Sequence, residues 1–132
     1  MKELYLKSTP HTPLINFNPN NGKMVIKGRA IPEDADAFWM PVLDWFESYV
    51  SNSLEDTFFS IHLEYFNIAS SKRILFLLYK LNELNENGKN VRVEWLHRKD
   101  DEEMYEVGQD YAYMVKVPFI FKEIKDEELL SA

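Results

Sequence analysis

The feature that most constrains the fold of this chain is the segment of residues 57–72, TFFSIHLEYFNIASSK, which reads as a strand, a short polar turn and the start of a helix. In its first part apolar and polar residues alternate, which is typical of a strand with one buried and one wet face. The pattern predicts that one set of side chains is buried, Phe59, Ile61, Leu63 and Tyr65, and that the other faces water, Ser60, His62 and Glu64. It indicates a sheet that helices cover on one side only, since parallel strands covered on both sides read as continuous apolar runs.

The rest of the chain alternates predicted strands and helices. Residues 13–17 and 23–28 flank the turn sequence PNNG and predict a β-hairpin, because Asn and Gly accept positive φ. Strands are also predicted over residues 91–97 and 117–124, and helices over about 32–50, over 70–87 and from the acidic residues 100–103 onward. Pro41 either bends the first helix or marks its true start. The apolar residues expected to bury this helix are Phe38, Val42, Trp45, Phe46 and Tyr49.

This order predicts an α/β fold with a four- or five-stranded mixed sheet and helices packed on one face. The helix over residues 70–87 is expected to join two parallel strands by a right-handed crossover. At 132 residues the chain is expected to form one domain, with residues 1–8 and 125–132 as flexible ends.

Composition narrows the classes of function. The chain has no cysteine, which excludes disulfides and metal sites made of thiolates. It shows no signal peptide and no apolar run long enough to span a membrane, so a cytoplasmic location is expected. Its net charge of −7 argues against nucleic acid as a partner, because that affinity comes mostly from clustered Lys and Arg. The expected partner is a protein.

Catalytic and metal sites find little support in the sequence. His62 and Glu64 lie two residues apart on one strand face, but His97 shares the phase of the buried residues on its own strand and points away from them. The acidic residues 100–103 suit a helix start better than a metal site. No nucleotide-binding or serine-hydrolase motif is present, and no cofactor is expected. A small enzyme that uses His62 and Glu64 stays open as a minor alternative.

The helix over residues 70–87 has more apolar surface than its core stripe requires. Leu75, Phe76 and Tyr79 extend beyond the stripe of Ile74, Leu77, Leu78, Leu81 and Leu84. These residues either contact the first helix or form an exposed docking surface. The predicted partner-binding surface is the turn before this helix together with its outer side, and comprises Asn67, Ile68, Ser70, Leu75 and Tyr79.

Four sequence segments carry a resemblance to a known family. GRAIPE at residues 28–33, the helix around Trp45, NIASSK at residues 67–72 and the strand with Trp95 together resemble the SiaC family of bacterial regulatory phosphoproteins, which are STAS-like domains related in fold to anti-sigma-factor antagonists. The resemblance implies a non-enzymatic switch. In that family a kinase related to histidine-kinase ATPases phosphorylates a hydroxyl in the turn before the central helix, and a PP2C-type phosphatase removes the phosphate. The unphosphorylated form binds its target, in one case a diguanylate cyclase that makes cyclic di-GMP for biofilm formation.

The chain departs from this family pattern at the phosphorylated position. The family's Thr directly follows the Asn, and Ile68 follows Asn67 here. The nearest hydroxyls are Ser70 and Ser71. Either phosphorylation has moved along the turn, with Ser70 as the first candidate, or the protein stays permanently in its binding-competent state, or Ser70 is only a helix N-cap.

A phosphate on this turn would add negative charge at a helix N-terminus and weaken docking without unfolding the domain. If the two central strands are parallel neighbours, the turn lies at the same sheet edge as His97, Arg98 and Lys99. These three residues are the predicted phosphate contacts.

Overall fold

The computed structural model describes residues 1–125 as one six-stranded sheet with three helices. The hairpin expected from the PNNG turn forms, and every predicted helix is present. In chain order the elements are β1 Leu4–Leu6, β2 Leu14–Phe17, β3 Lys23–Ala30, α1 Ala35–Ser51, β4 Asp56–Phe66, α2 Ile68–Glu86, β5 Asn90–Arg98, α3 Glu102–Met114 and β6 Phe119–Ile124.

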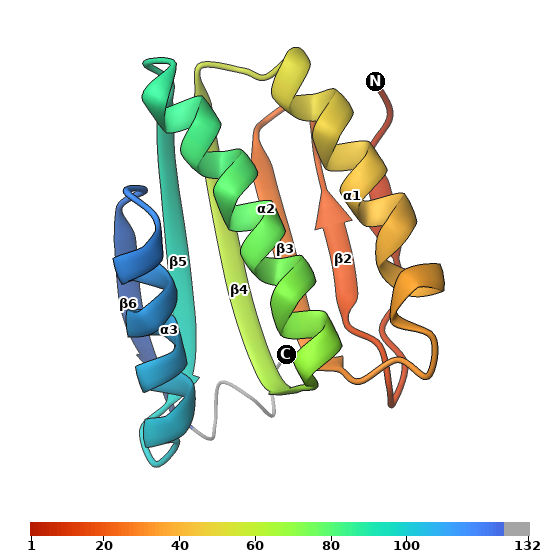
Figure 1. The fold of residues 1–132 in the computed structure, drawn as a ribbon, viewed down its shortest axis with the longest axis vertical. Coiled ribbons are helices and arrows are strands. Elements are labelled where there is room, and N and C mark those ends of the chain that lie inside the picture. The colour runs from red at the N-terminus through yellow and green to blue at the C-terminus, as the bar shows by residue number, and fades with distance from the viewer. Residues whose placement is uncertain (126–132) are drawn as a thin grey trace.

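The strands lie in the sheet in the same order as in the chain. The first three pair antiparallel, and β3, β4, β5 and β6 pair parallel to their neighbours. Each parallel pair is joined by one helix. When successive crossover connections have the same hand and each adds its strand on the same side of the previous one, their helices lie on the same face of the sheet. All three helices accordingly cover one side of the sheet (Figure 1). This confirms the predicted mixed sheet with helices on one face.

The core between the helices and the sheet is strongly aromatic. The Phe17 ring centroid lies 5.4 Å from those of Trp45 and Phe59 and 5.9 Å from that of Phe46. The buried residues of α1 are Trp39, Val42, Phe46 and Tyr49, whereas the predicted Phe38 and Trp45 are half-buried at its sides. The spacing from Trp39 through Val42 and Phe46 to Tyr49 is that of a helix stripe, so the sequence contained this signal.

The predicted number of strands is wrong. The sheet has six strands because Leu4–Leu6 pairs with β2. The N-terminal residues are also held by the Trp45 indole, which donates to the Lys2 carbonyl at 2.7 Å. Residues 1–8 are therefore not simply a flexible end. Of the other predicted flexible end, residues 126–132 lie outside the described residues.

Tyr65 is 60% exposed, although the alternation places it inside. Gly28 pairs with Leu63 but Arg29 pairs with Tyr65, so Glu64 is an extra residue in β4 and forms a bulge. A bulge reverses the facing of the residues after it. Phe66, paired with Ala30, therefore packs against the core, and Tyr65 turns to the open face.

The helix boundaries differ slightly from the predicted ones. Helix α1 begins at Ala35, with the Asp34 side chain accepting from the Ala37 N–H, so Pro41 lies inside it and does not mark its start. Helix α2 begins two residues before the predicted Ser70 and ends at Glu86, followed by Gly88 with φ of 86°. The described residues contain no helix long and apolar enough to cross a membrane.

Candidate functional site

The start of α2 is built by Asn67, which ends the turn after β4. Its backbone N–H donates to the Ala30 carbonyl at 3.0 Å, and its side-chain oxygen accepts from the Ser70 N–H at 2.8 Å. Asn67 is therefore the N-cap of α2, a position that Asn fills well because its short amide reaches the free N–H groups of the first turn. The alternative in which Ser70 is the N-cap is wrong.

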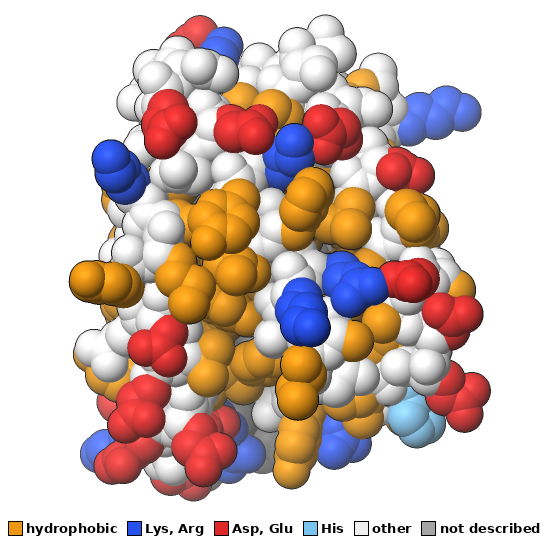
Figure 2. Space-filling model, in the orientation of Figure 1, with side chains coloured by type: hydrophobic (Ala, Val, Ile, Leu, Met, Phe, Trp, Pro, Cys, Tyr) orange, Lys and Arg blue, Asp and Glu red, His pale blue; other side chains and the backbone are white. Residues whose placement is uncertain are grey.

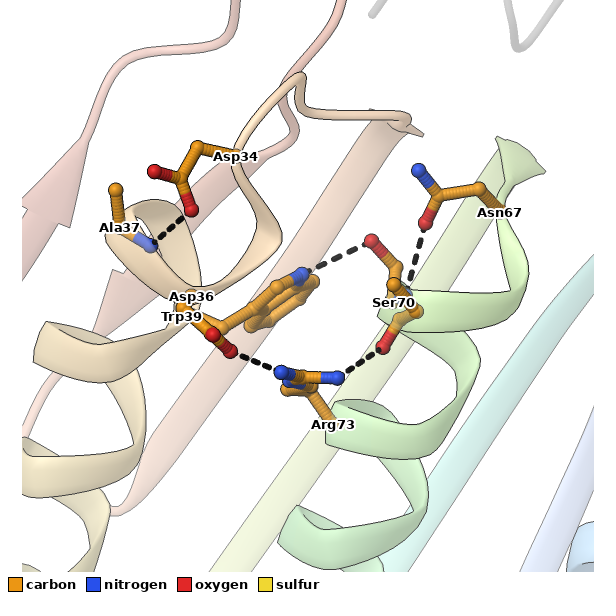
Figure 3. A network of polar contacts seen from close by, with 8 residues as sticks. Asp34, Asp36, Ala37, Trp39, Asn67, Ser70 and Arg73 are labelled. Carbon is orange, nitrogen blue, oxygen red and sulfur yellow. Dashed lines mark hydrogen bonds and ion pairs between the residues drawn. The ribbon is translucent and has the colours of Figure 1, made fainter.

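Ser70 instead joins the two long helices. It is fully buried, and its Oγ accepts a hydrogen bond of 2.9 Å from the Trp39 indole of α1 (Figure 3). Without this hydroxyl the buried indole N–H would have no acceptor, which carries a free-energy cost. In this conformation Ser70 faces α1 and reaches neither a docked partner nor a kinase.

Arg73 of α2 also contacts α1, nearer the surface. Its guanidinium forms an ion pair with Asp36 of α1 (Figure 3). It also donates to the Ala69 carbonyl at 3.3 Å. Trp39, Asp36 and Arg73 were all missed in the sequence. For Trp39 the helix stripe was a usable signal, but the pairing of Arg73 with a residue 37 positions away leaves no local pattern.

Ser71 has a different environment. It is half-buried, its Oγ donates to the Ile68 carbonyl at 3.0 Å, and its own carbonyl accepts from the Tyr111 hydroxyl of α3. Burial raises the pKa of Tyr111, which keeps that hydroxyl a donor. Ser71 is thus the more accessible of the two predicted phosphoacceptors.

The outer side of α2 carries a second stripe, which we call the outer stripe and which consists of Ile68, Lys72, Leu75 and Tyr79. Its spacing of four, three and four residues is that of the buried Ser70, Ile74, Leu77 and Leu81 shifted by two positions, so the outer stripe lies on the side of the helix away from them. Ile68 is 77% exposed and Tyr79 is 46% exposed, whereas Leu75 is half-buried. Phe76 borders the stripe, 43% exposed, with the Lys80 ammonium 5.4 Å from its ring.

Apolar side chains gather over the middle of the helical face, with basic groups among them and acidic groups nearer the rim (Figure 2). Of the predicted partner-binding residues, Ile68, Leu75 and Tyr79 lie together on the outer stripe and Asn67 caps its end. Ser70 lies on the opposite, buried side.

The basic residues at the end of β5 contact groups other than the turn before α2. The His97 ring packs on Tyr105 of α3, with centroids 4.9 Å apart, and Lys99 lies in a shallow depression beside Glu123 of β6. The surface next to the end of β4 is lined instead by Asp101 and Glu103. Arg98 pairs with Asp100 at 3.6 Å. Contact of His97, Arg98 and Lys99 with a phosphate on the turn stays a prediction.

The other polar groups offer little for catalysis. Among the described residues, no group of three or more His, Cys, Asp or Glu is placed to hold a metal ion. His62 lies on the open face, where burial and then the Lys27 charge lower its pKa, while Glu64 acts in the opposite sense. His97 lies on the helix-covered side, as its strand phase predicts.

The sequence profile of the SiaC family, described as regulatory phosphoproteins, matches residues 6–124. The chain belongs to the SiaC family. A protein of Pseudomonas aeruginosa (strain UCBPP-PA14) is 24% identical over 119 residues, which cover 90% of this chain and 94% of that protein.

Solved SiaC structures have the same fold. Apo-SiaC from P. aeruginosa superposes with a TM-score of 0.84 at 24% identity, covering 92% of this chain and 99% of that chain. A crystal structure of the P. aeruginosa diguanylate cyclase SiaD in complex with its activator SiaC gives a TM-score of 0.87 at 23% identity, with the same coverage. This chain is therefore a SiaC family regulatory protein with the SiaC fold, as the resemblance implied.

Proposed function

We propose that this protein is a non-enzymatic regulator that binds a target protein through the outer stripe of α2, and that the target is a diguanylate cyclase. The observation that carries the proposal is Ile68, an isoleucine that is 77% exposed at the first position of α2 and continues in line with Leu75 and Tyr79. Exposed apolar side chains that line up on a rigid helix are typical of a docking surface. The cyclase target is supported by the P. aeruginosa SiaC that is crystallised with SiaD. The proposed location is the cytoplasm, which fits a chain without cysteine.

The same residues favour a permanently binding-competent form. Ile68 has no hydroxyl to phosphorylate, and the Ser70 hydroxyl is buried against Trp39. A phosphoryl group on Ser70 would first require the junction between α1 and α2 to open.

Control by a histidine-kinase-like kinase and a PP2C-type phosphatase is the second candidate. The family description as regulatory phosphoproteins favours it, and the half-buried Ser71 is the hydroxyl that needs the smaller rearrangement.

The docking surface is tested with Ile68→Glu and Tyr79→Glu, measured as binding to a SiaD-type diguanylate cyclase and as activation of that cyclase. Each change should weaken binding by about tenfold or more, the loss typical of a central apolar contact. Tyr5→Glu is the matched control, because Tyr5 is 56% exposed on the first strand of the sheet, away from α2. If the Tyr5 variant loses as much binding as the Tyr79 variant at unchanged melting temperature, the outer stripe is not the docking surface.

The switch is tested by comparing wild type with Ile68→Thr in the presence of the cognate kinase and ATP. A permanently competent form predicts no phosphate on wild type and one on the variant, located by mass spectrometry on the peptide of residues 67–72. A phosphate on Ser71 or Ser70 of wild type would instead support the second candidate.

A further inference from the structure

The uncovered face of the sheet concentrates positive charge in an acidic protein. On β3 the side chains that alternate with the buried Met24, Ile26 and Ala30 include three cations. On β5 Arg92 adds a fourth, besides Arg98, which pairs with Asp100, and β6 adds a fifth. We call this group the sheet cations: Lys23, Lys27, Arg29, Arg92 and Lys122. The whole chain carries a net charge of −7, so the opposite sign on this face is a local property.

These cations lack the carboxylate partners that three cations on the helix side have. Arg73, Lys80 and Lys89 each form an ion pair with a carboxylate, to Asp36, Glu47 and Glu55 respectively. Within residues 1–125, none of the five sheet cations forms an ion pair or donates a hydrogen bond to a carboxylate.

The carboxylates on the open face have other neighbours. Glu94 accepts from the Ser60 hydroxyl at 3.2 Å, and Asp56 accepts from the Asn90 side chain at 2.9 Å. Glu64 sits at the bulge of β4. Within residues 1–125, the three carboxylates of this face therefore offset only part of the charge of the five sheet cations.

Two of the sheet cations are held in place by aromatic rings. The Arg29 guanidinium lies 5.5 Å from the Tyr65 ring centroid, and that of Arg92 lies 5.4 Å from the Phe58 centroid. A cation over a ring face is attracted to it, which restricts the side chain before any ligand arrives. The N–H groups at the edge of the guanidinium remain available, and their fork geometry fits a carboxylate. The bulge that turns Tyr65 outward creates the first of these pairs.

Apolar side chains lie among the sheet cations. Leu96 pairs with His62, which pairs with Lys27, so these three form one row across the sheet. Val25 and Leu96 are half-buried, and Ile120 is 43% exposed on β6. A ligand that covers this face would meet cations separated by apolar side chains.

We propose that this sheet face is a second binding site, which takes an acidic polypeptide segment of a partner protein with apolar residues between its carboxylates. The carboxylates would pair with Arg29, Arg92 and Lys27, and the apolar residues would cover Leu96 and Ile120. Nucleic acid fits less well, because both aromatic rings are already covered by guanidinium groups and offer bases no free face, and because the net charge repels a polyanion. The site lies on the opposite side of the sheet from α2 and is independent of the docking surface proposed above (Figure 1).

The test uses a short fluorescent peptide of Glu and Leu residues and measures its binding to the full chain by anisotropy. Wild type should bind the peptide, and binding should weaken as salt rises because exposed charges are screened. The double variant Lys27→Gln with Arg29→Gln should bind about five- to tenfold more weakly, as expected for two lost surface ion pairs. Arg92→Gln, at an exposed position, gives a second variant if the first one melts at a lower temperature.

The matched control is Lys89→Gln with Lys116→Gln, which removes the same charge from positions away from both the open face and the outer stripe. It should leave peptide binding within about twofold of wild type, the residual effect of net charge alone. An equal loss in the control, or no binding by wild type, overturns the proposal. So does tighter binding of a single-stranded oligonucleotide or of phosphatidylglycerol vesicles through the same residues, because the ligand class would then be wrong.

Discussion

Replacing Ser70 by alanine isolates the contact that joins the two long helices at the candidate site. The Trp39 indole N–H is fully buried and donates a hydrogen bond of 2.9 Å to the Ser70 hydroxyl. The change to alanine removes this acceptor. A buried donor that loses its acceptor costs roughly 1–3 kcal/mol. Alanine returns up to about 0.5 kcal/mol through its higher helix propensity. The net loss in the free energy of unfolding should be roughly 0.5–3 kcal/mol, a fall of about 2–10 °C in melting temperature for a domain of this size.

Urea unfolding followed by circular dichroism measures this loss, and Ser71→Ala is the matched control. The Ser71 hydroxyl only bonds the carbonyl of Ile68 within the same turn, so its removal should change the free energy of unfolding by about 0.5 kcal/mol or less. A double-mutant cycle with Trp39→Phe, which lacks the indole donor, identifies the source of the effect. If Ser70→Ala costs as much in the Trp39→Phe background as in wild type, the hydrogen bond does not explain the loss and the reasoning is refuted.

Two further changes test the sheet face and the third helix. The pKa of His62 is lowered from 6.5 in the folded protein, so the unfolded chain binds the proton more readily. The free energy of unfolding should therefore fall as the pH drops from 6.5 through the lower native pKa. His62→Gln should flatten this part of the pH profile measured by urea unfolding. An unchanged profile would contradict the burial of His62. Gly108→Ala should lower the free energy of unfolding by about 1–3 kcal/mol despite a gain in helix propensity, because the new Cβ would lie 2.5 Å from Trp95 Cδ1. In the same urea assay the control Gln109→Ala, at an exposed position, should change the free energy of unfolding by about 0.5 kcal/mol or less. A Gly108→Ala variant as stable as wild type would show that α3 can shift.

Periodicity predicted the fold well because the covered sheet and the amphipathic helices impose it directly on the sequence. Alternation in β4 and β5 and the stripe of α2 located these elements to within about two residues, the usual precision for such boundaries. Tyr65 was misplaced because a bulge adds one residue without any mark in the apolar pattern. The strand Leu4–Leu6 was missed because three residues are too few to show a period.

The candidate site was predicted less completely. The apolar excess at Leu75 and Tyr79 was visible as surplus beyond the core stripe, and the structure places both with Ile68 on one side of α2. Ser70 was misjudged because Asn67 and Ser70 are both residue types that cap helices, and local sequence does not decide between them. The deciding contact is with Trp39, 31 residues away in the chain.

The agreement between chain order and strand order has a consequence for how the protein is made. As the chain leaves the ribosome, each new parallel strand is added at the current edge of the sheet, and no pair of strands has to separate to admit a later one. Each addition closes only one strand-helix-strand loop, so the entropy lost at each step is that of a short connection. The sheet can therefore grow in the direction of synthesis, with every intermediate exposing a single parallel edge until β6 completes it.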